Sequence, residues 1–564
     1  MTNNEKILLA LLPFWTPLIP PMGIACLKSF LRQHDYTVVT VDANTEKQFK
    51  DLYNHYFDTL KEMIPKDKRG NFYSIGQDVF HNHLMAHLNY KRESQYIQLV
   101  KILLEKTFYT SEKDEYVLRL NRIIASFYSS LRGYVLDLLE RHRPMVLGLS
   151  VCSGTLPASL FAFRLTREKY PHIKTIMGGG IFCDQLAMGT PNFEILLEKT
   201  RDYIDKFIVG EGEIILLKLL RGELPESQRV YWFGDIKGGN LDLSSVDIPD
   251  FSDFELHHYP YLSAYTSRSC PHQCNFCSDT VMWGKYRKKT PPQIVDELSR
   301  LYQKHKYQLV MMSDLLLNPI VTDLAKEFIK TGISIYWDGC LRAEKPACDR
   351  ENTMLWRKGG FYKARIGCES GSEKVLKNMN KNISLEQMKA AISSLAYAGI
   401  QTTTYWVIGY PGESEEEFQQ TLDLITELRD DIYEAECRPF YYYLTGQANS
   451  MDWAKKNKSI PLYPGSAEEM LLFQTWVLDG KPSREETYKR VHRFEEHCKS
   501  LGIPNPYTMA DIFAADQRWK KLHQNAVPSL FKFRDNSTYI DECKHIKELS
   551  IISDIPKDDG DFDF

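Results

Sequence analysis

The stretch Ser267-Arg-Ser-Cys270-Pro-His-Gln-Cys274-Asn-Phe-Cys277 places three thiols within eight residues. It comes directly after Ser263-Ala-Tyr-Thr266, a short run that predicts a β-strand. Of the 12 cysteines in the chain, only these three cluster. This pattern indicates one metal site in a reduced compartment rather than a disulfide framework.

Three thiolates bind three irons of a cubane cluster and leave the fourth iron open to a small chelating molecule. A structural zinc ion is an alternative, because zinc needs a fourth ligand and His272 lies inside the loop. Three unrelated buried cysteines are another. The spacing C-x3-C-x2-C resembles that of the radical SAM superfamily, whose members bind S-adenosylmethionine (SAM) at the open iron. The resemblance implies a 4Fe-4S cluster on Cys270, Cys274 and Cys277.

Strand-like runs alternate with helical ones over residues 262–450, which predicts a partial (β/α)6 barrel. The region from 451 to 564 is expected to be helical, and its acidic end to be disordered. After the strand at 263–266, further strands are predicted at Gln308-Leu-Val-Met-Met312, Ile333-Ser-Ile-Tyr-Trp337, Lys363-Ala-Arg-Ile366, Thr402-Thr-Thr-Tyr-Trp-Val407 and Glu436-Cys-Arg-Pro-Phe-Tyr-Tyr-Tyr443.

Two turns after predicted barrel strands resemble SAM-binding segments of the same superfamily. In Gly367-Cys-Glu-Ser-Gly-Ser372 the resemblance implies that Glu369 and Ser370 contact SAM, although this composition also suits a helix start. In Ile408-Gly-Tyr-Pro-Gly-Glu413 it implies that Gly409 and Pro411 lie near the adenine, although any tight turn uses Gly and Pro. By the same resemblance, the backbone of Phe276 approaches the adenine. Arg342 is either a ligand of the SAM carboxylate or substrate, or a surface arginine.

The first 225 residues predict a Rossmann-like sheet of five strands, followed by a linker over 226–261. Residues 46–140 interrupt this pattern with aromatic and charged residues at helical spacing, which predicts a helical insertion. Ligands of such sheets bind at the carboxyl ends of the strands. The five strands are expected at Lys6-Ile-Leu-Leu-Ala-Leu-Leu12, Val38-Val-Thr-Val-Asp42, Met145-Val-Leu-Gly-Leu-Ser150, Lys174-Thr-Ile-Met177 and Lys206-Phe-Ile-Val209.

The turns of this sheet resemble those of the cobalamin-binding domain that is fused to many radical SAM enzymes. The relevant stretches are Pro13-Phe-Trp-Thr-Pro-Leu-Ile-Pro-Pro-Met-Gly23, Gly148-Leu-Ser150, Gly178-Gly-Gly180 and Gly210-Glu-Gly-Glu213. No Asp-x-His occurs in the chain, so the motif that supplies a cobalt-ligating histidine in methionine-synthase-type domains is missing. A flavodoxin-like sheet that binds nothing is the alternative. The resemblance implies that cobalamin is bound by Ser150, Ser153, Thr155, Gly178, Gly179, Gly180, Gly210, Glu211 and Gly212.

Composition narrows the class of protein. With 43% hydrophobic and 26% charged residues the chain is typical of globular proteins, and its 564 residues predict several domains. The net charge of −4 offers no overall field for nucleic acid. The apolar run at 7–12 is too short to span a membrane and lacks the flanks of a secretory signal, so a cytoplasmic protein without membrane contact is expected.

Together the two resemblances imply a cobalamin-dependent radical SAM enzyme, with a methyltransferase as the leading hypothesis. Such an enzyme methylates an unactivated carbon, or phosphorus, through a 5′-deoxyadenosyl radical and methylcobalamin. Its partners would be a small-molecule or peptide substrate and an electron donor such as flavodoxin or ferredoxin. The alternatives are a cyclisation or rearrangement without methyl transfer, a methylthiotransferase, and a cobalamin-binding protein without catalysis. A methylthiotransferase is expected to carry a second three-cysteine cluster, and Cys26, Cys152 and Cys183 are too dispersed to form one.

Overall fold

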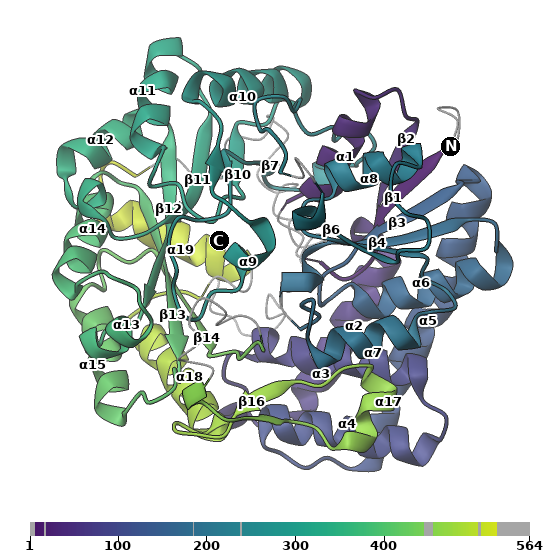
Figure 1. The fold of residues 1–564 in the computed structure, drawn as a ribbon. Coiled ribbons are helices and arrows are strands. Elements are labelled where there is room, and N and C mark those ends of the chain that lie inside the picture. The colour runs from purple at the N-terminus through teal and green to yellow at the C-terminus, as the bar shows by residue number, and fades with distance from the viewer. Residues whose placement is uncertain are drawn as a thin grey trace.

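A computed structural model describes residues 6–15, 19–183, 185–236, 240–444, 455–505 and 509–526. Two parallel sheets lie side by side, the amino-terminal one on the right of Figure 1 and the second one on the left. The predicted disordered end falls in residues 527–564, outside the described part of the chain. None of the described helices is long and apolar enough to cross a membrane.

The amino-terminal sheet has six strands in the order β2-β1-β3-β4-β5-β6, and every pairing is parallel. The predicted number of five is therefore wrong by one. The additional strand, β6, lies in the expected linker and is only three residues long, so it carries no hydrophobic period. The strands are β1 (Ile7–Leu11), β2 (Val38–Asp42), β3 (Val146–Ser150), β4 (Lys174–Gly178), β5 (Lys206–Val209) and β6 (Val230–Trp232).

Both faces of this sheet are covered, because successive side chains of a strand point to opposite sides. Ile7 and Leu9 join a core with α1 and α8, whereas Leu8 and Ala10 join a second core with α6, α7 and the inserted helices. The covering helices are α1 (Met22–Arg32), α6 (Leu156–Lys169), α7 (Pro191–Lys199) and α8 (Glu213–Arg221).

The segment between β2 and β3 is helical, as predicted. Its aromatic side chains build a core in which the Phe14 ring lies 5.0–5.3 Å from those of Tyr53, Phe80 and Phe127. Its second helix, α3, also reaches the carboxyl-terminal region, where Asn89 donates to the carbonyl of Met470 over 2.9 Å. The inserted helices are α2 (Lys47–Met63), α3 (Phe72–Asn89), α4 (Glu93–Phe108) and α5 (Asp114–His142).

The second sheet is the predicted six-stranded partial barrel. Its order is β14-β13-β12-β11-β10-β7, all parallel, and β14 and β7 form its two edges. The strand expected at 333–337 begins only at Tyr336. The strands are β7 (Leu262–Ala264), β10 (Leu309–Met312), β11 (Tyr336–Leu341), β12 (Phe361–Glu369), β13 (Gln401–Ile408) and β14 (Glu434–Pro439), and the helices are α10 (Pro291–His305), α11 (Val321–Thr331), α12 (Arg350–Lys358), α13 (Glu373–Asn378), α14 (Leu385–Tyr397) and α15 (Glu415–Glu427).

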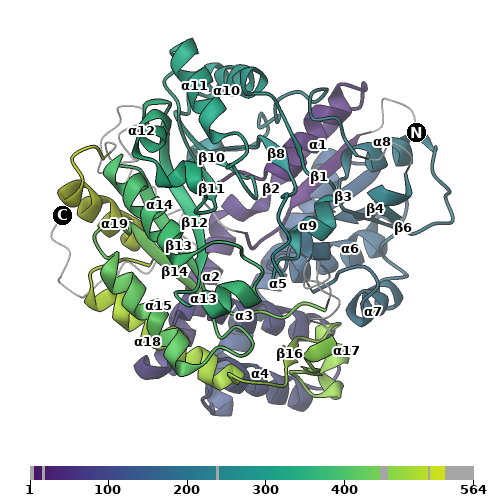
Figure 2. The same cartoon turned by 60° about the vertical axis from the view of Figure 1, so that its left-hand side comes forward.

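The carboxyl-terminal region is not entirely helical, which corrects the prediction. An antiparallel hairpin of β15 (Ser459–Pro461) and β16 (Trp476–Leu478) precedes α18 (Arg484–Ser500) and is connected through α17 (Glu468–Leu471) to the inserted helices. Figure 2 shows β16 and α17 beside α4. The last helix, α19 (Met509–Leu522), packs Ile512 and Phe513 against residues at the amino end of the barrel strands.

Candidate active site

The cysteine loop starts at the end of β7 and is fixed by one buried carboxylate. Asp314, just after β10, accepts hydrogen bonds from the backbone N–H of Thr266 over 2.9 Å and from its hydroxyl over 2.7 Å. The hydroxyl of Ser267 donates to the same carboxylate over 2.5 Å. Ser267–Arg268 (β8) then pairs antiparallel with Arg287–Lys288 (β9). The loop is therefore anchored to the barrel just before Cys270.

The three cysteines of the loop are free thiols, with Cys274 buried and Cys270 and Cys277 half-buried. Burial raises the pKa of Cys277 to about 12, and the neighbouring Asp279 carboxylate raises it further. Burial also raises the pKa of Cys270. Since metals bind thiolates, metal binding at this loop must release protons.

A polar network surrounds the loop. Nη1 of Arg342 lies 3.4 Å from Sγ of Cys274, and its Nε lies 3.4 Å from the Glu344 carboxylate. Nε2 of His272 contacts the same carboxylate at 3.0 Å. Arg342 is 5% exposed, which removes the surface alternative for this residue. His272 is paired with Glu344, so the structure does not aim it at the thiols as a fourth ligand of zinc.

Glu369 ends β12 in the left-handed region, with φ of +65°. Its carboxylate accepts from Nζ of Lys381 at 2.6 Å, and both side chains are at most 9% exposed. The Lys381 ammonium also lies 5.7 Å from the ring centroid of Phe276. Ser370 is fully buried, and its hydroxyl accepts from the N–H of Ser372 over 3.1 Å. The structure therefore brings Phe276, Arg342 and Glu369 to the cysteine loop, and adds Lys381, for which the sequence carries no signal.

The turn after β13 has its own structural constraints. The N–H of Gly409 donates to Glu413 over 2.9 Å, and Glu413 pairs with Arg490 of α18 at 3.0 Å. A Cβ on Gly409 would lie 2.1 Å from the hydroxyl of Thr487, so α18 requires glycine here. Phe276 packs against the hydrophobic cluster that contains Tyr410 of this turn. The turn thus lies beside the cysteine loop, while Gly409 has a sufficient structural role and Pro411 lines a separate cavity.

A cavity of about 420 Å³ lies between the amino-terminal sheet and the barrel. A Cβ on Gly23 or Gly180 would meet no atom within 4 Å, so the backbone faces open space at both positions. Such a surface fits a large flat ring that lies against backbone. The cavity is lined by Ser150, Gly178, Gly179, Gly180, Gly210, Glu211 and Gly212 on one side, and by Tyr265, Ser267, Arg268 and Ser269 on the other.

Two residues expected at this cavity are placed elsewhere. Ser153 is exposed and is not among the residues that line this cavity. The hydroxyl of Thr155 is fully buried and accepts from the N–H of Cys152 over 3.0 Å. Thr155 therefore shapes the turn after β3 instead of facing the cavity.

Glutamates of the Gly210-Glu-Gly-Glu213 turn bind Arg268 of β8, just before the three cysteines, and Arg287 of the paired strand β9. Arg268 contacts Glu213 at 2.5 Å and Glu211 at 3.2 Å, and Arg287 donates to Glu211 over 3.0 Å. Burial opposes ionisation of Glu213, but the Arg268 guanidinium outweighs it and lowers the pKa of this carboxyl. Glu211 thus joins the two sheets as well as lining the cavity. Neither arginine was predicted, although Arg268 lies two residues before Cys270.

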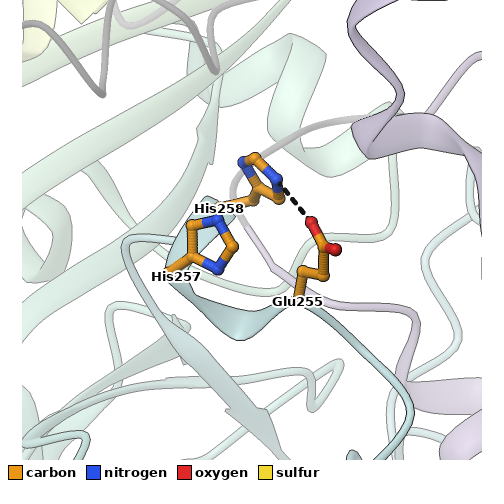
Figure 3. Close-up of side chains that lie close together, drawn as sticks. All are labelled: Glu255, His257 and His258. Atoms are coloured by element: carbon orange, nitrogen blue, oxygen red, sulfur yellow. Dashed lines mark hydrogen bonds and ion pairs between the residues drawn. The ribbon is translucent and has the colours of Figure 1, made fainter.

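A separate surface group could hold a metal ion. Ligand atoms of Glu255, His257 and His258 lie within 4.8 Å of one another, and they form the one such group among the residues that the structure describes. Figure 3 shows the three side chains close together. Burial lowers the pKa of His258 to about 4, helped by His257 and Lys50. At neutral pH its 3.0 Å contact with Glu255 is therefore a hydrogen bond of the neutral imidazole.

Comparisons with known proteins agree with this geometry. Residues 265–425 match the radical SAM superfamily. The chain is 24% identical over 318 residues to the anaerobic magnesium-protoporphyrin IX monomethyl ester cyclase of Rubrivivax gelatinosus. This match covers 51% of this chain and 55% of the cyclase. It is 26% identical over 336 residues to the bacteriochlorophyllide d C-12(1)-methyltransferase of Chlorobaculum tepidum, covering 54% of this chain and 68% of that enzyme. The chain thus spans less than two thirds of the cyclase.

The fold matches a solved structure along nearly the whole chain. The radical S-adenosylmethionine methyltransferase TsrM from Kitasatospora setae, solved with tryptophan substrate and a SAM analogue, has a TM-score of 0.58 at 12% identity. The match covers 96% of this chain and 100% of TsrM. A second structure of that enzyme carries cobalamin and a [4Fe-4S] cluster. At this identity the likeness establishes the shared fold of both sheets.

Proposed function

Residues 265–425 form a radical SAM domain, and we propose that the chain is a cobalamin-dependent enzyme that methylates an unactivated carbon, or phosphorus. The observation that carries the proposal is the cavity between the sheets. Its glycine-lined wall comes from the expected cobalamin-binding turns, and its opposite wall includes Ser267, Arg268 and Ser269, which lead into the cysteine loop. A ligand in this cavity lies next to the loop that holds the cluster.

The protein's part is to bind and orient three cofactors. Cys270, Cys274 and Cys277 hold a 4Fe-4S cluster. Glu369, held by Lys381, accepts from the ribose or ammonium of SAM, and Arg342 binds the SAM carboxylate. When bound, the cluster and cobalamin supply the reductive cleavage of SAM and the methyl group.

Substrate positioning and exclusion of water are the remaining tasks. The wall that faces cobalamin is largely apolar, with Leu9, Leu11, Val151, Ile176 and Ile208 beside the glycines. Such a wall keeps water from a reactive radical. A small-molecule or peptide substrate, a flavodoxin- or ferredoxin-type electron donor and a cytoplasmic location belong to the same proposal.

A cyclase or rearrangement enzyme is the second candidate function. The similarity to a cyclase over 318 residues favours it, and the same cofactors would serve it. The product distinguishes the two functions, because only methyl transfer adds CH2 to the substrate mass. A methylthiotransferase would need a second cysteine cluster, and Cys26 is buried in α1 beside Leu243 and Tyr265.

The test is an anaerobic assay of the full chain, reconstituted with iron, sulfide and cobalamin and given SAM and a reductant. Formation of 5′-deoxyadenosine, together with S-adenosylhomocysteine and a methylated product from a candidate substrate, supports methyl transfer. 5′-Deoxyadenosine without any methylated product favours the cyclase or rearrangement function. A chain that binds cobalamin but never cleaves SAM would be a carrier.

A further inference from the structure

A second cavity, of about 460 Å³, is built from parts of the chain that lie far apart in sequence. Asp78 comes from inserted helix α3, Pro411 from the turn after β13, Phe440 from the end of β14, Tyr463 from the segment after β15, and Arg484 from α18. These elements meet at the bottom of Figure 1, where α3, β16 and α18 surround the end of β14. The cavity adjoins the active site, because the Phe440 ring lies 5.3 Å from that of Tyr410 and packs, like Phe276 beside Cys277, against the cluster to which Tyr410 belongs.

Two opposite charges line this cavity without pairing with each other. Among the described residues, the contact to the Asp78 carboxylate is a single long hydrogen bond of 3.5 Å from the Tyr441 hydroxyl. The Arg484 guanidinium lies 4.3 Å from the ring centroid of Tyr488 and donates to the hydroxyl of that residue over 2.7 Å and to the carbonyl of Lys106. No ion pair within 4.0 Å joins Asp78 and Arg484 in this part of the structure. Each keeps hydrogen-bonding capacity for a ligand.

The rest of the wall is aromatic, and the rim is basic. Tyr463 and Tyr488 are at most 8% exposed, and Nδ2 of Asn82 lies 3.5 Å from the Tyr463 hydroxyl. Lys456, Lys458 and Lys481 line the cavity at exposed positions, where Lys458 pairs with Asp479 at 3.8 Å and Lys481 with Glu486 at 3.2 Å. Because these pairs leave Lys456 over, the described part of the rim carries a small positive excess that favours an anionic group, while Asp78 inside favours a cationic one.

We propose that this cavity binds the substrate, and that the substrate carries an ammonium group for Asp78 and a carboxylate for Arg484, as an α-amino acid does. The inference rests on the proposed function, because it deepens that function by naming the substrate class. Two opposite charges that line one cavity without an ion pair between them match a zwitterion, since Asp78 would repel a purely anionic ligand and Arg484 would repel a purely cationic one. The tyrosine rings provide contact area for the remainder of the ligand.

The experiment screens the 20 standard L-α-amino acids against the full, cofactor-loaded chain by saturation-transfer NMR. The dissociation constant of the best binder is then compared with those of its decarboxylated amine and its N-acetyl derivative. The amino acid is expected to bind at least tenfold more tightly than either derivative. Asp78→Asn is expected to weaken amino-acid binding about tenfold or more and to leave the N-acetyl derivative unaffected. Arg484→Gln is expected to weaken the binding of the amino acid and of its N-acetyl derivative, and to leave the binding of the amine unchanged.

Asp51→Asn is the matched control, because Asp51 is exposed and ion-paired to Lys47 on the surface. No binding by any amino acid, equal binding of the three ligand forms, or equal effects of Asp78→Asn and Asp51→Asn would overturn the inference. Cobalamin and cluster absorbance and 5′-deoxyadenosine formation are recorded on the same samples. If wild type cleaves SAM but binds no amino acid, this inference alone fails. If it binds amino acids as expected but does not cleave SAM, the proposed function fails and the binding site stands.

Discussion

Arg268, two residues before the first cluster cysteine, forms a 2.5 Å ion pair with Glu213 of the amino-terminal sheet. Both side chains are at most 9% exposed. The contact bridges 55 residues of sequence and ties the loop that holds the proposed cluster to the turn that lines the proposed cobalamin cavity. The relative position of the cysteine loop and this turn therefore depends on a buried charge pair.

Removal of this arginine should weaken the joint between the sheets. Arg268→Met leaves Glu213 as a buried charge without its partner, which typically costs about 3–5 kcal/mol. We expect the free energy of the first urea-unfolding transition to fall by about 3 kcal/mol, the lower end of that range, because Arg287 still holds Glu211. We also expect the variant to lose cobalamin during gel filtration. Arg300→Met is the control, since Arg300 is 45% exposed in its pair with Asp247 and should change stability by less than about 1 kcal/mol. Equal effects of the two substitutions would contradict this interpretation.

Lys381 should matter for SAM binding rather than for the cluster. Its ammonium holds the Glu369 carboxylate at 2.6 Å beside the cysteine loop. Hydrogen bonds to charged groups contribute about 1.5–3 kcal/mol, so Lys381→Met should raise the dissociation constant of SAM about tenfold to a hundredfold. The iron content and cluster absorbance should not change. Lys374→Met removes a comparable pair with Glu417 in which the lysine is 68% exposed, and normal SAM binding is expected. Loss of the cluster in Lys381→Met would show a structural role instead.

A side chain at Gly180 should block the first cavity. A Cβ there meets no atom within 4 Å, so the backbone tolerates the substitution and a larger side chain extends into the space that it lines. Gly180→Leu is expected to abolish cobalamin binding, measured by cobalt content, while the chain keeps its iron and cleaves SAM. Gly133→Leu on the exposed face of α5, where a Cβ also meets nothing, should retain cobalamin. Cobalamin retention by Gly180→Leu would place that cofactor elsewhere.

Amino-acid binding at the second cavity should depend on pH. Burial raises the pKa of Asp78 to about 6, although Arg484, the Tyr441 hydroxyl and Arg438 each lower it. Below pH 6 the carboxyl is neutral and cannot pair with an ammonium group, which itself stays charged. The dissociation constant of the bound amino acid should therefore rise about tenfold per pH unit below that value. Calorimetric titrations between pH 5 and 8 should show this rise in wild type and its absence in Asp78→Asn. The same slope in both proteins would rule out Asp78 as the titrating group.

Local signals in the sequence were sufficient to predict the cysteine loop and eleven of the twelve strands of the two parallel sheets. Each of these strands is a short run of β-forming residues bounded by turn residues. β6 was missed because Val230–Trp232 is too short to show a period. The hairpin of β15 and β16 was missed because its strands are three residues each and one of them contains Pro461.

The contacts that complete the site are not readable from local sequence. Lys381 reaches Glu369 across helix α13, and Arg268 reaches Glu213 from another sheet. The first pair depends on how the chain turns back around α13 and the second on how the two sheets pack, and neither is visible in a local sequence pattern. Conversely, the resemblance to cobalamin-binding domains implied that Thr155 faces the cavity, but its hydroxyl accepts a hydrogen bond from the backbone N–H of Cys152. Short polar side chains in turns often do so.

The most direct test of the central claim is the amount of 5′-deoxyadenosine released from SAM by the anaerobically reconstituted chain with dithionite as reductant. Wild type is expected to bind about four iron atoms per chain and to release 5′-deoxyadenosine. Cys274→Ser is expected to lose the iron and the release of 5′-deoxyadenosine. Cys348→Ser alters a cysteine outside the loop and is expected to keep both. A wild-type chain that carries its full iron content and releases no 5′-deoxyadenosine would contradict the assignment of a radical SAM enzyme.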